Sequence, residues 1–199
     1  MSPRAYDRTL RKAAAEEAKR RIAEAAAGLH AQHGSRGTSH AMIAKAAGVS
    51  LPTVYKYFPT PNDLIPACTG AAAAKAPVAL DASVFDGLPR VPDRVRALAR
   101  AVFRLHQYFA PWLRWTDADA ESLPALREFL DGGRRHRRDL LRRALAPRGA
   151  RPPAEPLVLV AHVLLEHPSW KTLTATGKSS DQAAAVVADA VNALVRSHR

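Results

Sequence analysis

The chain has 199 residues, 47% of them hydrophobic, and a formal net charge of +12. The apolar content is enough for a buried core and argues against wholesale disorder, while no apolar run approaches the ~18 residues that span a membrane. The positive charge makes nucleic acid the first partner to consider, because Lys and Arg replace the counterions of phosphates.

Two segments hold most of this charge. Residues 1–60 carry ten Lys or Arg against four Asp or Glu, and residues 134–151 carry eight Arg against one Asp. Residues 1–13 are polar and basic with no apolar stretch behind them, so we expect a flexible basic arm and no secretory signal. The single cysteine, Cys68, excludes an internal disulfide framework and favours a reducing, cytoplasmic location.

Helical periodicity predicts an all-α protein. The first helix should start near Ala14 and end before Gly34. A short helix follows over about residues 39–46, and Ser50 caps another that ends at Phe58. Thr60 then caps a fourth helix, with a proline in its first turn.

The remainder of the chain reads as a loop followed by a helical domain. Residues 77–92 are rich in Pro, Gly and Asp and predict a loop between two subdomains. Later helices are expected at about residues 93–110, 117–131, 133–145, 154–166 and 181–197. Residues 157–165 are apolar on almost all sides, so that helix should be buried in the domain or against a second subunit. The last helix also carries an apolar stripe.

The functional signal lies between Thr38 and Phe58. Two short helices separated by a turn at Gly48 are typical of a helix-turn-helix. The third helix should direct six side chains outward to phosphates and base edges: Leu51, Pro52, Thr53, Tyr55, Lys56 and Tyr57. Ser39 and His40, at the start of the second helix, can offer backbone N–H groups to a phosphate.

The sequence here resembles the TetR/AcrR family of bacterial regulators over about residues 18–64. The matching motifs are RRIAEAA, TSHAMIAKAAGVS, TVYKYFP and TPNDL. The resemblance implies an N-terminal three-helix DNA-binding head with a helix-turn-helix, joined to a larger helical body that binds a ligand and dimerises. On this basis we divide the chain into an arm (1–13), a DNA-binding domain (14–60) and a ligand-binding and dimerisation domain (61–199).

The resemblance also implies how such a protein works. A homodimer joined by its two C-terminal helices would place recognition helices in the major grooves of a palindromic double-stranded DNA operator, and a small-molecule effector would release it. Two positions depart from the family pattern: Ala41 replaces a longer polar residue, and Pro61 replaces a lysine that contacts phosphate. Leu51 cannot make a bidentate base contact, so specificity should lean on apolar contacts, DNA shape or the basic arm.

Aromatic residues in the first half of the body are candidates for the effector pocket. Such a pocket needs apolar walls and a few polar groups, and the candidate lining residues are Phe103, His106, Phe109, Trp112, Trp115 and Phe129. Ordinary core packing accounts for the same residues, and both interpretations stay open.

Three other patterns have weaker functional interpretations. His162 and Glu166 share a helix face, as an acid–base pair or metal ligands would, although the sequence offers no third ligand at a convincing spacing. The arginine run of residues 134–143 is either a second DNA-binding patch or a solvated face. Cys68 is a thiol sensor or a small core residue.

We therefore predict a sequence-specific transcriptional regulator, a repressor released by an effector, with no catalysis, no metal and no cofactor. The alternatives are a protein that binds DNA without sequence preference or an effector, and a small helical enzyme that uses His162 and Glu166.

Overall fold

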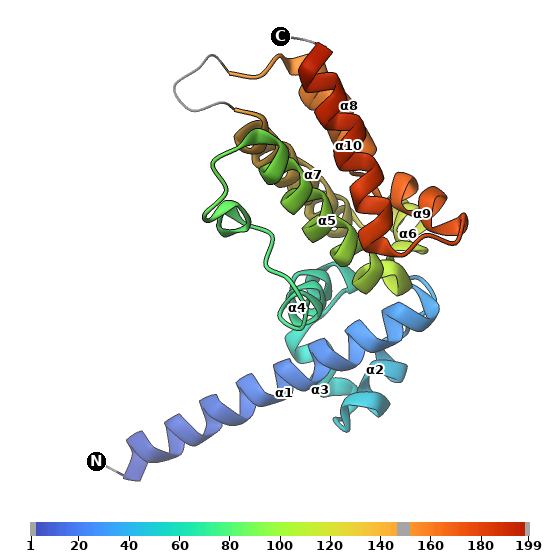
Figure 1. Cartoon of the computed structure of the whole chain (residues 1–199). Helices are drawn as coiled ribbons and strands as arrows, with labels where there is room; N and C mark the ends of the chain where they lie inside the picture. Colours follow the sequence, from blue (N-terminus) through green and yellow to red (C-terminus); the bar gives the residue numbers. More distant parts are fainter. Residues whose placement is uncertain (1–2, 147–151, 198–199) are drawn as a thin grey trace. The chain divides into compact units, whose positions relative to one another are not determined.

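The computed structural model describes residues 3–146 and 152–197. Within these ranges the chain is helical with no strand, which confirms the all-α prediction. Figure 1 shows the helices in chain order. Their bounds are α1 (Pro3–His33), α2 (His40–Ala47), α3 (Leu51–Tyr57), α4 (Pro61–Ala73), the 3-10 helix η1 (Ala82–Phe85), α5 (Val91–Leu113), α6 (Thr116–Ser122), α7 (Pro124–Leu145), α8 (Glu155–Leu164), α9 (His167–Ala175) and α10 (Ser180–Ser197).

Internal contacts divide the chain into two units. The first unit consists of residues 3–75 and 114–129, and the second of residues 76–113 together with the described residues from 130 onward. By these contacts α4 and α6 group with the helix-turn-helix, while the functional domains at residues 14–60 and 61–199 stay a prediction. None of the helices described is long and apolar enough to cross a membrane.

In the first unit, α1 packs against α2 and α4, and α2 packs against α3. The buried side chains that join them are aliphatic, with Ile22, Ile43, Val54 and Leu64 each no more than 1% exposed. Burial of branched side chains this complete stabilises a small unit by ~2 kcal/mol per side chain. These contacts hold α3 against α2 within the unit.

The local signals at the helix ends behave as predicted. Ser39 caps α2, and Ser50 caps α3. Thr60 and Asp63 form a capping box in which each side chain accepts a hydrogen bond from the other residue's backbone N–H.

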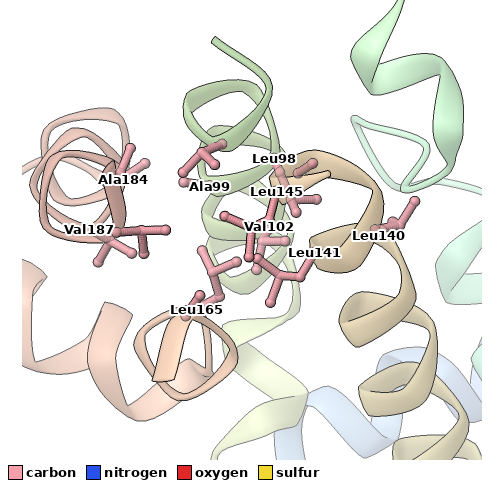
Figure 2. Close-up of a cluster of buried hydrophobic side chains, with 14 of the residues drawn as sticks. Leu98, Ala99, Val102, Leu140, Leu141, Leu145, Leu165, Ala184 and Val187 are labelled. Carbon is pink, nitrogen blue, oxygen red and sulfur yellow. The ribbon is translucent and has the colours of Figure 1, made fainter. Parts of the chain in front are cut away.

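The second unit has its own core between α5, α7, α8 and α10. Figure 2 shows aliphatic side chains of α5, α7 and α10 meeting in one cluster with Leu165, in the turn that follows α8. Leu98 and Val102 of α5, Leu141 of α7 and Ala184 of α10 are each at most 2% exposed. This cluster gives the second unit a hydrophobic core independent of the first.

Three predicted helix boundaries are wrong. The first helix begins at Pro3 instead of near Ala14, so residues 3–13 are helical where a flexible arm was expected. Between Pro3 and His33 most residues are Ala, Arg, Lys, Glu, Leu or Gln, which favour a helix, and no proline lies inside the segment. Met1 and Ser2 of the expected arm lie outside the described residues.

The second error concerns glycine. Gly132 and Gly133 were expected to end a helix, yet α7 continues through both, and the actual break falls before Pro124. Each glycine costs a helix interior only ~1 kcal/mol relative to alanine. The buried side chains Leu126 and Leu140 on either side offset that cost through packing, whereas proline lacks the N–H needed to continue α6.

The third error lies at the other end of the domain. The helix expected over residues 154–166 is shorter, and a separate α9 begins at His167. Pro168 in the first turn of α9 is compatible only with a helix start, because it has no N–H to donate.

Candidate nucleic-acid interface

The turn between α2 and α3 depends on Gly48. Its backbone is left-handed (φ 61°, ψ 40°), and its N–H donates to the carbonyls of Ala44 and Lys45. Arg21 of α1 reaches the same end of α2 and donates to the carbonyls of Ala47 and Gly48. The positive φ angle favours glycine at residue 48, where a Cβ would also come within 2.5 Å of Arg21 Nη2 and displace the end of that flexible side chain.

Helix α3 is anchored on one side and exposed on the other. Val54 is completely buried and Phe58 is 8% exposed, while Leu51 and Tyr55 are 38% and 50% exposed. Of the other predicted contact residues, Pro52 and Lys56 are exposed, and Thr53 and Tyr57 are half-buried. A short helix that presents one face this way has the dimensions of a major-groove reader.

The side chain of His40 has a structural role, while the predicted contact of its backbone N–H with a phosphate stays a prediction. Its side chain is buried, and its Nε2 donates to the Phe58 carbonyl oxygen at the end of α3 over 2.8 Å. The imidazole also stacks on the Tyr55 ring, with centroids 4.7 Å apart and planes 6° apart. The side chain therefore links the start of α2 to the end of α3 and supports one face of Tyr55, so only its backbone stays available for the predicted phosphate contact.

Positive charge lies close to Tyr57. The ammonium groups of Lys56 and Lys19 lie 5.3 and 5.6 Å from the centroid of its ring. Lys19 belongs to α1 and also pairs with Glu16 over 3.0 Å. Two cations from neighbouring helices thus flank the end of α3, where a phosphate would be attracted.

The loop that leads from α1 into α2 is held by α6, an arrangement that the sequence analysis missed. The buried carboxylate of Asp119 accepts hydrogen bonds from the backbone N–H groups of Ser35 (2.6 Å) and Arg36 (3.2 Å). Trp115 Nε1 donates to the carbonyl of Ala31 over 3.3 Å. These partners are 83 or 84 positions apart in sequence, so no local pattern could reveal them.

The predicted pocket residues are divided between the two units. Phe103 is fully buried in the core of the second unit, and Trp115 and Phe129 belong to the first, where Phe129 is 49% exposed. Phe109 and Trp112 contact each other near the end of α5, with centroids 5.9 Å apart.

His106 is buried beside the core of the second unit. Its Nε2 donates to the Leu165 carbonyl over 2.9 Å, and burial lowers the pKa of the imidazole to about 4. The neutral ring therefore contributes a fixed hydrogen bond within the unit. A role for these six residues in ligand binding stays a prediction.

The His162–Glu166 pair includes a third member. His162 Nε2 lies 3.3 Å from Glu166 Oε1, and Arg137 Nη2 lies 2.9 Å from the same oxygen. Burial lowers the pKa of His162, and although Glu166 acts to raise it, three arginines of the run act with burial, so the net shift is downward and the neutral ring is favoured. The Glu166 carboxylate is thus held in an ion pair with Arg137, and in the described residues no group of three or more His, Cys, Asp and Glu could hold a metal ion.

Arginines of the 134–143 run form ion pairs, and Cys68 is buried. Arg134 pairs with Asp131, and Arg142 pairs with Asp139 and Glu155. Cys68 is buried, and burial raises the pKa of its thiol to about 12, so the reactive thiolate is strongly disfavoured.

The family match covers the helix-turn-helix, whereas structural similarity extends over most of the chain. Residues 22–68 match the model of a family described as bacterial regulatory proteins, tetR family. A TetR-family transcriptional regulator from Rhodococcus sp. has a similar structure over 90% of this chain and 99% of its own, with TM-score 0.64 and 19% sequence identity. A Clostridium perfringens fatty acid metabolism regulator is similar over 86% of this chain and 96% of its own, with TM-score 0.52 and 14% identity. No curated protein matches the sequence. At these identities the two structures establish the fold.

Proposed function

Because this chain belongs to the TetR family of bacterial transcriptional regulators, we propose that it is a homodimeric repressor that binds a palindromic operator and leaves it when an effector binds. The observation that carries the proposal is the exposed face of α3, which begins next to a turn fixed by Gly48 and ends between two lysines. The proposal includes regulation without catalysis, in the cytoplasm where a bacterial chromosome lies.

A second copy of the chain is the proposed occupant of the outer face of α8. Leu159, Val160 and Val163 are 42%, 46% and 63% exposed, and together with Leu164 they line a shallow, wholly apolar hollow. Helix α10 packs beside α8 and exposes Val186 to 43%. Exposed apolar side chains gathered on α8 favour an isologous partner, which presents the same apolar surface in return. Two heads related by this symmetry also match a palindrome.

The release step is proposed as a population shift. An effector that binds the second unit more tightly in one conformation than in another changes the fraction of protein that fits the operator. The backbone passes between the two units next to α6 and within α7, so a change in the second unit has a covalent route to Asp119 and the loop that it holds.

The alternative is a protein that binds DNA without sequence preference, and the many basic residues support it. Selection of bound duplexes from a random library at about physiological salt separates the two. Enrichment of a palindrome with half-sites about one helical turn apart supports the regulator. Binding that enriches no sequence and is lost to bulk genomic DNA supports the alternative.

Removing the outward side chains of α3 tests the assigned surface. We expect Tyr55→Ala and Lys56→Ala each to weaken operator binding roughly 10-fold, equivalent to ~1.4 kcal/mol. Because Lys56 is expected to contact a phosphate, its removal should also make the fall of log K with log salt less steep by about one. Binding assays at several salt concentrations measure both effects, with the exposed Lys171→Ala in α9 as the matched control. Unchanged affinity in both variants, with the fold intact by circular dichroism, would contradict the surface.

His40 offers a second test, because it supports Tyr55 without being exposed itself. His40→Ala removes both the ring stack and the bond to the Phe58 carbonyl, and we expect a loss of roughly 2–3 kcal/mol in unfolding free energy. His40→Phe keeps a ring beneath Tyr55, so operator affinity should fall less than in His40→Ala. Chemical denaturation and operator binding measure the two effects. Equal affinity losses in both variants would show that the stack does not orient Tyr55.

A further inference from the structure

The side chains exposed at the start of α3 cannot form paired hydrogen bonds with a base. Leu51 is 38% exposed, Pro52 is exposed, and neither has a polar side-chain atom. The first residues of a recognition helix are the ones that reach base edges in this class of motif. Bidentate readout of guanine or adenine requires Arg, Lys, Asn or Gln, and the first turn of α3 contains none of these.

The polar groups next to this surface already have partners within the unit. The Thr53 hydroxyl lies 2.7 Å from the Ser50 hydroxyl, which also caps the helix. The Ser39 hydroxyl accepts from the Met42 N–H over 3.2 Å. Ala41, exposed on α2, has no polar side-chain atom. The hydroxyl of Thr53 is thus held by the cap, while its methyl group stays as a possible contact.

The longer polar side chains of α3 lie later in the helix. Tyr55 carries a single hydroxyl and is fixed against His40, and Lys56 sits in the last turn with its ammonium 5.3 Å from the Tyr57 ring centroid. A group near the C-terminal end of a short recognition helix is placed for the phosphate backbone, which positions the helix and carries no sequence information directly.

The major groove offers these apolar side chains one apolar group, the C5-methyl of thymine. We infer that α3 reads thymine methyl groups through Leu51, Pro52 and the methyl of Thr53, so that operator preference depends on those methyls. The inference rests on the proposed DNA-binding function and assigns the specificity of that site. Burying one methyl against an aliphatic side chain changes affinity by roughly three- to tenfold.

Deoxyuridine provides the test, because it pairs as thymine does and lacks only the methyl. Each thymine of the selected operator is replaced in turn, in both half-sites, and affinity is measured with the full-length protein. We expect one or two thymine positions per half-site to lose roughly three- to tenfold in affinity. At those positions 5-methylcytosine should bind better than cytosine, because it returns the methyl to the groove.

Variants of Leu51 assign the effect to the protein. At one operator position, Leu51→Ala should bind the thymine and uracil duplexes with equal affinity. Leu51→Met, which keeps an apolar tip, should still bind the thymine duplex more tightly than the uracil duplex. Uracil duplexes that all bind within twofold of the thymine duplex would overturn the inference, as would a selected half-site without thymine. Neither result affects the proposed function, which fails separately if the thymine duplex itself is not bound specifically.

Discussion

Val163→Asp is expected to convert the protein to monomers and to weaken operator binding by at least roughly 100-fold. Val163 is 63% exposed at the centre of the apolar face of α8, between Val160 and Leu164 along the chain. In an isologous interface each substitution occurs twice, so two carboxylates would be buried without partners, and each costs several kcal/mol. A monomer then binds one half-site and loses the contribution of the second.

The monomer itself should fold normally, because an exposed side chain contributes little to its own unit. Sedimentation velocity measures the oligomeric state, and operator binding is measured on the same sample. Thr172→Asp puts the same charge on the exposed face of α9 and should leave the dimer intact. A dimeric Val163→Asp protein that binds the operator normally would show that the apolar face of α8 has another use.

The helix-turn-helix could be predicted because its determinants are local. Ser39 and Ser50 each accept a hydrogen bond from the N–H three residues ahead, and Gly48 supplies a left-handed turn that few other residues adopt. Each of these signals is complete within a few residues of sequence. Their agreement with one another is what made the motif readable.

Positions that depend on distant partners could not be predicted in this way. Asp119 looks like any acidic residue in an exposed helix, yet it is buried because the loop at Ser35 comes to it from 84 positions away. Phe103 and Phe129 are the same residue type in helical surroundings, and one is fully buried while the other is 49% exposed. Aromatic content indicates material for a core or a pocket and does not say which side chain faces inward.

Helix α8, which is apolar on nearly all sides, has one buried face and one exposed face. Its inner face, with Val158 and Ala161, is completely buried in the second unit, while Val163 remains exposed. The sequence analysis left open whether a helix of this kind is buried in its own domain or against a second subunit. One face packs in the domain, and the other is free for a partner.

Arg94→Met should cause the largest loss of stability, about 4 kcal/mol, because Arg94 is buried and each orphaned buried polar group costs ~1–3 kcal/mol. Its Nε donates to the Ala144 carbonyl over 3.2 Å, its Nη1 to the Pro89 carbonyl over 2.8 Å, and its Nη2 to the Ala146 carbonyl. Methionine keeps most of the apolar stem but removes the donor from all three oxygens, two of which, those of Ala144 and Ala146, lie at the negative end of α7.

Arg96→Met is the matched control two residues along α5. Arg96 pairs with Asp189 over 2.8 Å, with both side chains about half exposed or more, and such a pair contributes ~0–1 kcal/mol. Thermal unfolding should therefore separate the two variants by roughly 10 °C. Arg94→Lys should fall between them, since one ammonium cannot span carbonyls from α7 and from the loop before α5. If Arg94→Met is as mild as its control, the desolvation of the guanidinium must cancel its hydrogen bonds, because the charge is removed together with the donors.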